Sequence, residues 1–145
     1  MRKLLLATVL AAAAASVPAA FGSSSAPAVR FVTPTVNQTT KSTVVVHVAL
    51  ANFKLDPADV GKRNKAHRGH LHFQMDGGKF DYPKYSGPNG QLAKTLGIAG
   101  KYSPSIAPMI IYRHLPAGKH TLVVFLANND HSPVGPKASV TFTVR

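Results

Sequence analysis

The chain of 145 residues contains no cysteine and no tryptophan, and its five acidic residues are all aspartate because glutamate is absent. Without cysteine the chain cannot form a disulfide, bind a metal through thiolate, or use a cysteine nucleophile. A blue-copper centre needs a cysteine ligand and is excluded as well. The sequence has no G-x-S-x-G turn, and a two-carboxylate glycosidase would have to rely on aspartate alone. We therefore expect a protein without catalytic activity.

The chain begins with the layout of a secretory signal peptide. Two basic residues precede an apolar run over residues 4–15, and small residues then offer cleavage sites between Ala19 and Ala28. The run is shorter than the ~20 residues that a membrane-spanning helix needs, so cleavage is expected and no transmembrane segment remains. We assign residues 1–28 to the signal peptide and a short linker, and residues 29–145 to one domain. The domain is expected to be secreted, outside the cell or in the periplasm.

Positive charge dominates the remainder of the chain. Seventeen lysines and arginines face five aspartates, which gives a formal net charge of +12 that falls to +10 when the two basic leader residues are removed. Such a surface attracts polyanions, for example the anionic polymers of a bacterial cell envelope. The basic residues are scattered and form no dense run with interleaved aromatics, so specific nucleic-acid binding is not expected. We expect a monomeric binding or accessory domain of the envelope.

Short segments with alternating apolar residues, separated by turn signals, follow one another along the chain. Helical periodicity of useful length is absent, apart from one turn expected at Asp56-Pro57. These features predict an all-β fold, an antiparallel sandwich of about seven strands. The expected strands cover residues 29–32, 43–53, 70–75, 79–82, 109–114, 119–127 and 138–145.

A stretch rich in glycine, proline and serine, residues 82–108, is predicted to be one long loop. It alternatively contains a weak strand around residues 93–96. Tyrosines and a lysine in or beside this loop are candidates for a surface that binds sugars or anionic polymers. The alternative is that the tyrosines pack the loop onto the sheet. The residues of this candidate surface are Tyr82, Lys84, Tyr85 and Tyr102.

Three short motifs carry a resemblance to known domains. LPAGKHTL at residues 115–122 resembles the start of the penultimate strand in fibronectin type III and bacterial Ig-like domains. Together with GHLHF at residues 69–73 and NNDHSP at residues 128–133, it resembles a group of bacterial secreted domains of unknown function. The resemblance implies an Ig-like sandwich and no known reaction. Where Ig-like domains often have a corner tyrosine this chain has His120, so we expect one ring nitrogen to bond a backbone carbonyl near residues 113–116.

Histidines form the candidate metal site. His70 and His72 are two residues apart on one strand, so their side chains leave the same face. In an Ig-like sandwich the start of this strand and the loop after the penultimate strand lie at the same end, which brings His131 close. His67 or Asp130 is the candidate fourth ligand or supporting partner. Imidazole and carboxylate ligands without thiolate suit Zn²⁺ or Cu²⁺.

The alternative interpretation of this cluster needs no cofactor. Histidines on the polar face of a half-buried strand are commonly solvent-facing. An aspartate in a loop of this kind, here Asp130, commonly caps its own turn through the backbone. His120 enters at the opposite end of the sandwich and is expected to take no part in the site.

Overall fold

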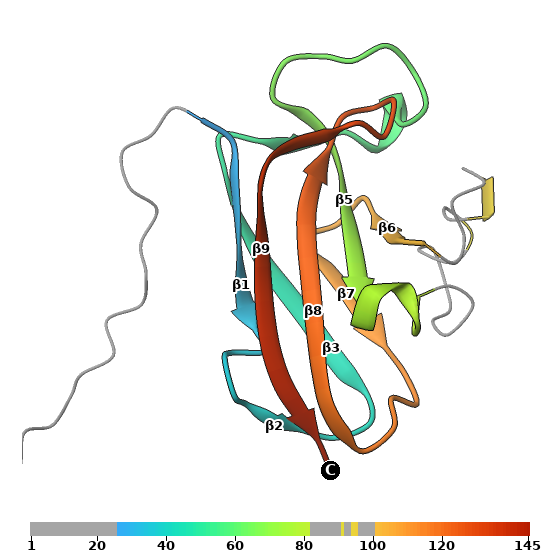
Figure 1. The fold of residues 1–145 in the computed structure, drawn as a ribbon. Coiled ribbons are helices and arrows are strands. Elements are labelled where there is room, and N and C mark those ends of the chain that lie inside the picture. Colours follow the sequence, from blue (N-terminus) through green and yellow to red (C-terminus); the bar gives the residue numbers. More distant parts are fainter. Residues whose placement is uncertain (1–25, 82–90, 92–93, 96–100) are drawn as a thin grey trace, which may run out of the picture.

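The computed structural model describes residues 26–81, 91, 94–95 and 101–145, so the predicted leader lies almost entirely outside the described residues. Two β-sheets face one another (Figure 1). The smaller sheet contains β1 (Ala28–Thr33), β3 (Val44–Ala51) and β7 (Met109–Tyr112). The larger sheet is built on β5 (Arg68–Met75), β8 (Gly118–Ala127) and β9 (Pro133–Val144), with the short strands β2 (Thr39–Thr40), β4 (Lys54–Leu55) and β6 (Ser103–Ser105) beside them. Two 3₁₀ turns, η1 (Pro57–Asp59) and η2 (Asp76–Gly78), flank β5.

The strand order is that of an Ig-like sandwich. The smaller sheet runs β1-β3-β7 and the larger β2-β9-β8-β5-β4, with β6 also paired to β5. Without the two-residue strands β2 and β4, seven strands remain in the described part of the chain. The first, second and fifth of these (β1, β3 and β7) form one sheet, and the third, sixth and seventh (β5, β8 and β9) lie in the other, as in Ig domains. The prediction of an all-β sandwich of about seven strands is confirmed. The start of β5 and the turn after β8 lie at the same end, at the top of Figure 1.

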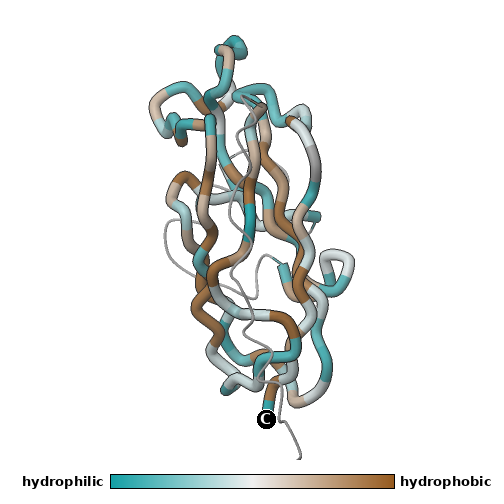
Figure 2. The backbone as a smooth tube through the Cα atoms, turned by 90° about the vertical axis from the view of Figure 1, so that its left-hand side faces the viewer, coloured by the Kyte–Doolittle hydropathy of each residue, from teal (hydrophilic) through white to brown (hydrophobic). Residues whose placement is uncertain are grey.

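The core forms between the two sheets from residues that alternate along each strand. Figure 2 shows the hydrophobic residues gathered along the strands and hydrophilic ones in the loops at the top. Burying one such side chain contributes roughly 1.5–3 kcal/mol to the free energy of unfolding, so the core between the sheets supplies most of the stability. The expected inward faces of three strands are confirmed by burial of Val44, Val46, Val48, Leu122, Val124, Leu126, Val140, Phe142 and Val144.

Two expectations about strands are wrong. The strand expected over residues 79–82 is absent from its described part, where residues 79–80 form a turn. The place beside β5 is taken instead by β6, whose Pro104 is compatible with an edge position. The weak strand considered at residues 93–96 is also contradicted, because residues 94–95 are helical.

A buried carboxylate explains why the chain turns away after β5. Asp81 is only 2% exposed. Its Oδ2 accepts from the backbone N–H of Met75 at 2.9 Å, and its Oδ1 accepts from the hydroxyls of Tyr112 (2.6 Å) and Ser103. Burial raises the pKa of Asp81, and these three donors oppose that rise by stabilising the carboxylate. Asp81 thereby ties β5, β6 and β7 together across both sheets.

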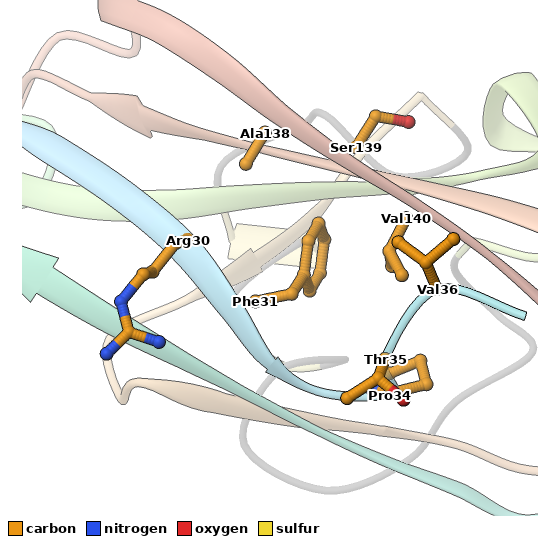
Figure 3. A pocket seen from close by; sticks show the side chains of 8 residues that line it. All are labelled: Arg30, Phe31, Pro34, Thr35, Val36, Ala138, Ser139 and Val140. Carbon is orange, nitrogen blue, oxygen red and sulfur yellow. The ribbon is translucent and has the colours of Figure 1, made fainter. Parts of the chain in front are cut away.

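An open groove of about 410 Å³ lies where β1 and β9 diverge (Figure 3). Its walls are mainly apolar, and Val36 at its rim is 68% exposed. None of the residues that line it is a histidine or an acid, so it has no metal-binding chemistry. Separately, no helix within the described ranges has the length and apolar character to cross a bilayer.

We predict that Asp81→Ala lowers the free energy of unfolding by about 3 kcal/mol, because three buried donors lose their acceptor. Urea denaturation of the purified protein measures this change. Asp59→Ala is the matched control, because Asp59 pairs with exposed Lys62 and Lys65 at the surface and its loss should cost less than about 1 kcal/mol. Equal losses for the two variants would contradict the role assigned to Asp81.

Candidate metal centre

Two histidines of the centre come from β5. The core side chains Leu71 and Phe73 alternate with His70 and His72, which therefore point to the opposite face of the larger sheet. Antiparallel pairing places His70 opposite Ala127 and His72 opposite Phe125 on β8. The last residues of β8 thus lie directly beside both imidazoles.

The third histidine comes from the turn after β8. His131 has a left-handed backbone (φ 70°), and its N–H donates to the carbonyl of Asn128 at 3.0 Å. Asn128 in turn donates its N–H to the carbonyl of Ser132 at 2.8 Å, which closes the turn. A β-turn of this kind brings the chain back toward the start of β5, so the ring of His131 meets the ring of His70.

The loop before β5 braces this turn from outside. The N–H of Gly61 donates to the carbonyl of Asn129 at 2.7 Å, and the amide of the fully buried Asn129 donates to the carbonyl of Arg63 at 3.2 Å. Asn64 forms a two-way pair with Asp130, donating to its Oδ2 at 2.7 Å and accepting from its N–H at 3.0 Å. The turn that carries the third histidine is therefore fixed to a second segment of the chain.

The three imidazoles converge on one point. His70 Nε2 lies 2.9 Å from His72 Nε2 and 2.8 Å from His131 Nδ1. One nitrogen from each of the three rings falls within 4.8 Å of the others. Tetrahedral zinc with Zn–N bonds of 2.0–2.1 Å places its ligand atoms about 3.3 Å apart, so the two separations from His70 Nε2 need to widen by only about half an ångström.

Aromatic rings cover the centre on the side of His72. The ring of Tyr102 stacks on that of His72, with centroids 5.2 Å apart and planes 17° apart. Phe125 presents an edge-on contact to His72 at 5.3 Å and to Tyr102 at the same distance. As a result His70 and His72 are 0% and 2% exposed, while His131 remains half-buried.

Gly69 permits the close approach of β5 to the turn. A Cβ at this position would lie 1.9 Å from the carbonyl oxygen of Ala127, which no side chain tolerates. Only glycine therefore lets the start of β5 sit against the end of β8. The G-H-x-H order thus places the tight contact immediately before the two histidines of β5.

Burial keeps the imidazoles neutral. Desolvation, followed by the charge of His131, lowers the pKa of His70 to about 4. Desolvation lowers the pKa of His72 to about 3, with further contributions from His70 and His131. The pKa of His131 is also lowered by burial, against an opposing effect of the Asp130 carboxylate. Neutral imidazole is the form that binds a metal ion.

The other sequence-predicted residues lie apart from this point. Asp130 does cap its own turn: its Oδ1 accepts from the N–H and the hydroxyl of Ser132 at 2.9 and 2.6 Å. His67 lines a separate open groove, beside Phe53 and Arg68. Neither belongs to the group of three convergent ligands. Of the tyrosine and lysine surface, Tyr82, Lys84 and Tyr85 lie outside the described residues.

His120 occupies the corner that the motif predicts. Its Nε2 donates to the carbonyl of Pro116 at 2.9 Å, and its Nδ1 faces Asp76 Oδ2 at 2.7 Å. Asp76 Oδ1 also accepts from the N–H of Thr121 at 2.8 Å. Both ring nitrogens of His120 therefore face oxygen acceptors. This histidine fastens η2 to β8 at the end opposite the metal centre.

Sequence reasoning did not place Tyr102 and Phe125 at the centre. The sequence predicts for Tyr102 either a ligand-binding surface or packing onto the sheet, and its stacking on His72 of β5 agrees with the packing alternative without the pattern having named the partner. Phe125 points away from the core of the sandwich, yet it is only 5% exposed. An aromatic residue on the supposedly polar face of β8 is the signal that this face is covered.

Comparison with known proteins identifies structural likeness only. The chain matches no protein-family model and no curated protein. Among solved structures it is similar to fibronectin(III)-like modules of Clostridium thermocellum CbhA, with 12% identity, a TM-score of 0.44, and coverage of 81% of this chain and 96% of that one. It is also similar to the extracellular domain of a putative one component system from B. thetaiotaomicron, with 11% identity, a TM-score of 0.42, and coverage of 77% and 12%.

We predict that the metal-free protein loses stability as the pH falls from about 6.5 towards 4. In that window the unfolded chain protonates His70 and His72, whereas the folded chain, with their pKa values at about 4 and about 3, does not. Each proton taken up only on unfolding contributes up to roughly 1.4 kcal/mol per pH unit. Urea denaturation at several pH values measures this dependence.

His72→Phe should make the dependence shallower, because it removes one of the two groups. His47→Phe is the control, since His47 is exposed on β3, away from the cluster. An identical pH dependence in wild type and His72→Phe would show that His72 is not held neutral by the fold.

Proposed function

We propose that this protein is a secreted bacterial module that binds copper or zinc through His70, His72 and His131. The observation that carries the proposal is the convergence of one nitrogen from each of the three rings, 2.8 and 2.9 Å apart about His70 Nε2. The three nitrogens lie too close for each to point a ring proton at the others, and a metal ion relieves the crowding by accepting their lone pairs while each ring keeps its proton on its other nitrogen. Imidazole without thiolate is a ligand set suited to copper and zinc.

Three protein ligands leave one coordination position for a fourth group. A closed structural zinc site takes four protein ligands. The half-buried ring of His131 is the side from which an external ligand reaches the centre, because Tyr102 and Phe125 cover His72. We assign the centre a role in binding or carrying the metal, and we assign no catalytic step to it.

A second function rests on the charge of the surface. Basic residues outnumber acidic ones by 17 to five, and several of them are exposed on the described part of the chain, for example Lys41, Arg113 and Lys119. Such a surface supports association of a secreted, monomeric domain with anionic polymers of the cell envelope. This association does not depend on the histidines, so it can accompany metal binding.

We predict that the purified protein binds one equivalent of Zn²⁺ or copper and unfolds at a higher temperature with the metal. A metal at 100 times its dissociation constant should add about 2.7 kcal/mol to the free energy of unfolding. Metal analysis and thermal unfolding measure the two effects. His131→Ala should abolish both, and it changes a half-buried loop side chain with little risk to folding. His47→Ala should retain both, because His47 is exposed and remote.

Absence of bound metal and of any thermal shift in the wild type would overturn the metal-binding proposal. The polymer-binding function is tested separately by co-sedimentation with an anionic cell-wall polymer at low and high salt. Binding that weakens with salt and persists in His131→Ala supports it. Absence of sedimentation at low salt would contradict it.

A further inference from the structure

We infer that the three-histidine centre selects copper in its monovalent state, Cu(I), over divalent Zn²⁺. This inference rests on the proposed metal-binding function and specifies the ion. It is carried by the lack of negative charge among the ligands and the lack of compensation behind them, which disfavour an ion of charge +2 more than one of charge +1. Three separate observations on the described residues support it.

The first observation is that the ligand set itself carries no negative charge. Each ligand is an imidazole, and the convergent group contains no carboxylate. The nearest acid in sequence, Asp130, is exposed, and its two oxygens accept hydrogen bonds from Ser132 and Asn64. Its charge therefore acts on the centre only through solvent-exposed surroundings, where screening is strong.

The second observation is that the ring nitrogens behind the ligand atoms have no acceptor. His70 Nδ1 and His72 Nδ1 are buried and without a hydrogen-bond partner among the described residues. Metal-binding histidines usually donate this second N–H to a carboxylate or carbonyl, which offsets the positive charge that the metal induces on the ring. The missing acceptors leave that charge uncompensated, and the deficit grows with the charge of the ion.

The third observation is that a cation lies against the aromatic cover. Lys137 Nζ lies 5.5 Å from the centroid of Phe125, the ring that contacts His72. Lys101 precedes Tyr102 in the chain and is exposed. The potential at the centre is therefore raised by neighbouring positive charge as well as by the basic surface as a whole.

The charge of the ion decides which metal is favoured under these conditions. The cost of moving an ion from water into a buried site grows with the square of its charge, so a divalent ion costs about four times as much as a monovalent one of similar size. A carboxylate ligand ordinarily offsets this cost. In its absence, an ion of charge +1 on neutral nitrogen ligands loses least, and imidazole is a good copper ligand.

The test is competition under anaerobic conditions. The dissociation constant for Cu(I) is measured against a chromophoric Cu(I) chelator, and that for Zn²⁺ against a zinc-sensitive dye. We expect Cu(I) to bind more tightly by at least about 100-fold, which corresponds to about 2.8 kcal/mol. Zn²⁺ binding within tenfold of Cu(I) would overturn the inference and leave the metal-binding function intact. Binding of neither ion would instead refute the metal-binding function.

Two matched variants test the charge argument itself. Tyr102→Glu places a carboxylate beside His72, whereas Tyr102→Gln makes the same change of shape without charge. Coulomb energy scales with the charge of the ion, so the new carboxylate should strengthen Zn²⁺ binding more than Cu(I) binding. We therefore expect the ratio of Zn²⁺ affinity to Cu(I) affinity to be about tenfold higher in Tyr102→Glu than in Tyr102→Gln. The same carboxylate should lower the Cu(II)/Cu(I) reduction potential. Equal affinity ratios and equal potentials in two variants shown by thermal unfolding to be folded would refute the charge argument.

Discussion

β5 and β8 pair in antiparallel register from His70 opposite Ala127 to Met75 opposite Leu122, and the rest of the molecule depends on this pairing. Its inner face places apolar side chains of both strands in the core. Its outer face places the two β5 histidines beside Phe125 and leads the chain into the turn with His131. A slip of one residue would move the histidines into the core and the core residues to the outside. Core packing thus also fixes the positions of His70 and His72 in the candidate site.

The centre combines burial with an absence of charge compensation. A buried polar group normally has a hydrogen-bond partner, because leaving one unsatisfied costs roughly 1–3 kcal/mol. Here two ring nitrogens lack a partner among the described residues, and His70 Nε2 contacts only the ring nitrogens of His72 and His131. The strand and the braced turn hold the rings in this unfavourable arrangement, which is a common feature of sites that bind a ligand. In the proposed function, a bound metal ion supplies the interaction that the protein alone does not provide.

Stability and site geometry are linked through a buried acid, Asp81, that follows β5. Asp81 holds Ser103 at the start of β6, and the residue before it, Tyr102, covers His72. At the far end of β8, His120 fixes η2 through its 2.7 Å contact with Asp76 and also bonds the carbonyl of Pro116 at 2.9 Å. Polar groups at both ends of the β5–β8 pair therefore hold its register, while the apolar core supplies the free energy of folding.

The sequence by itself determined the sandwich, the inward faces of its strands, the corner role of His120 and the grouping of three histidines, because two-residue periodicity and turn residues are local signals. The tertiary structure decided that His70 and His72 are buried, because their cover comes from Tyr102 and Phe125 on other segments. The tertiary structure also shows that the carboxylate of Asp130 accepts hydrogen bonds from Ser132 and Asn64 and does not join the three histidines. Burial and charge compensation are sums over neighbours that are distant in sequence, and no local pattern records them.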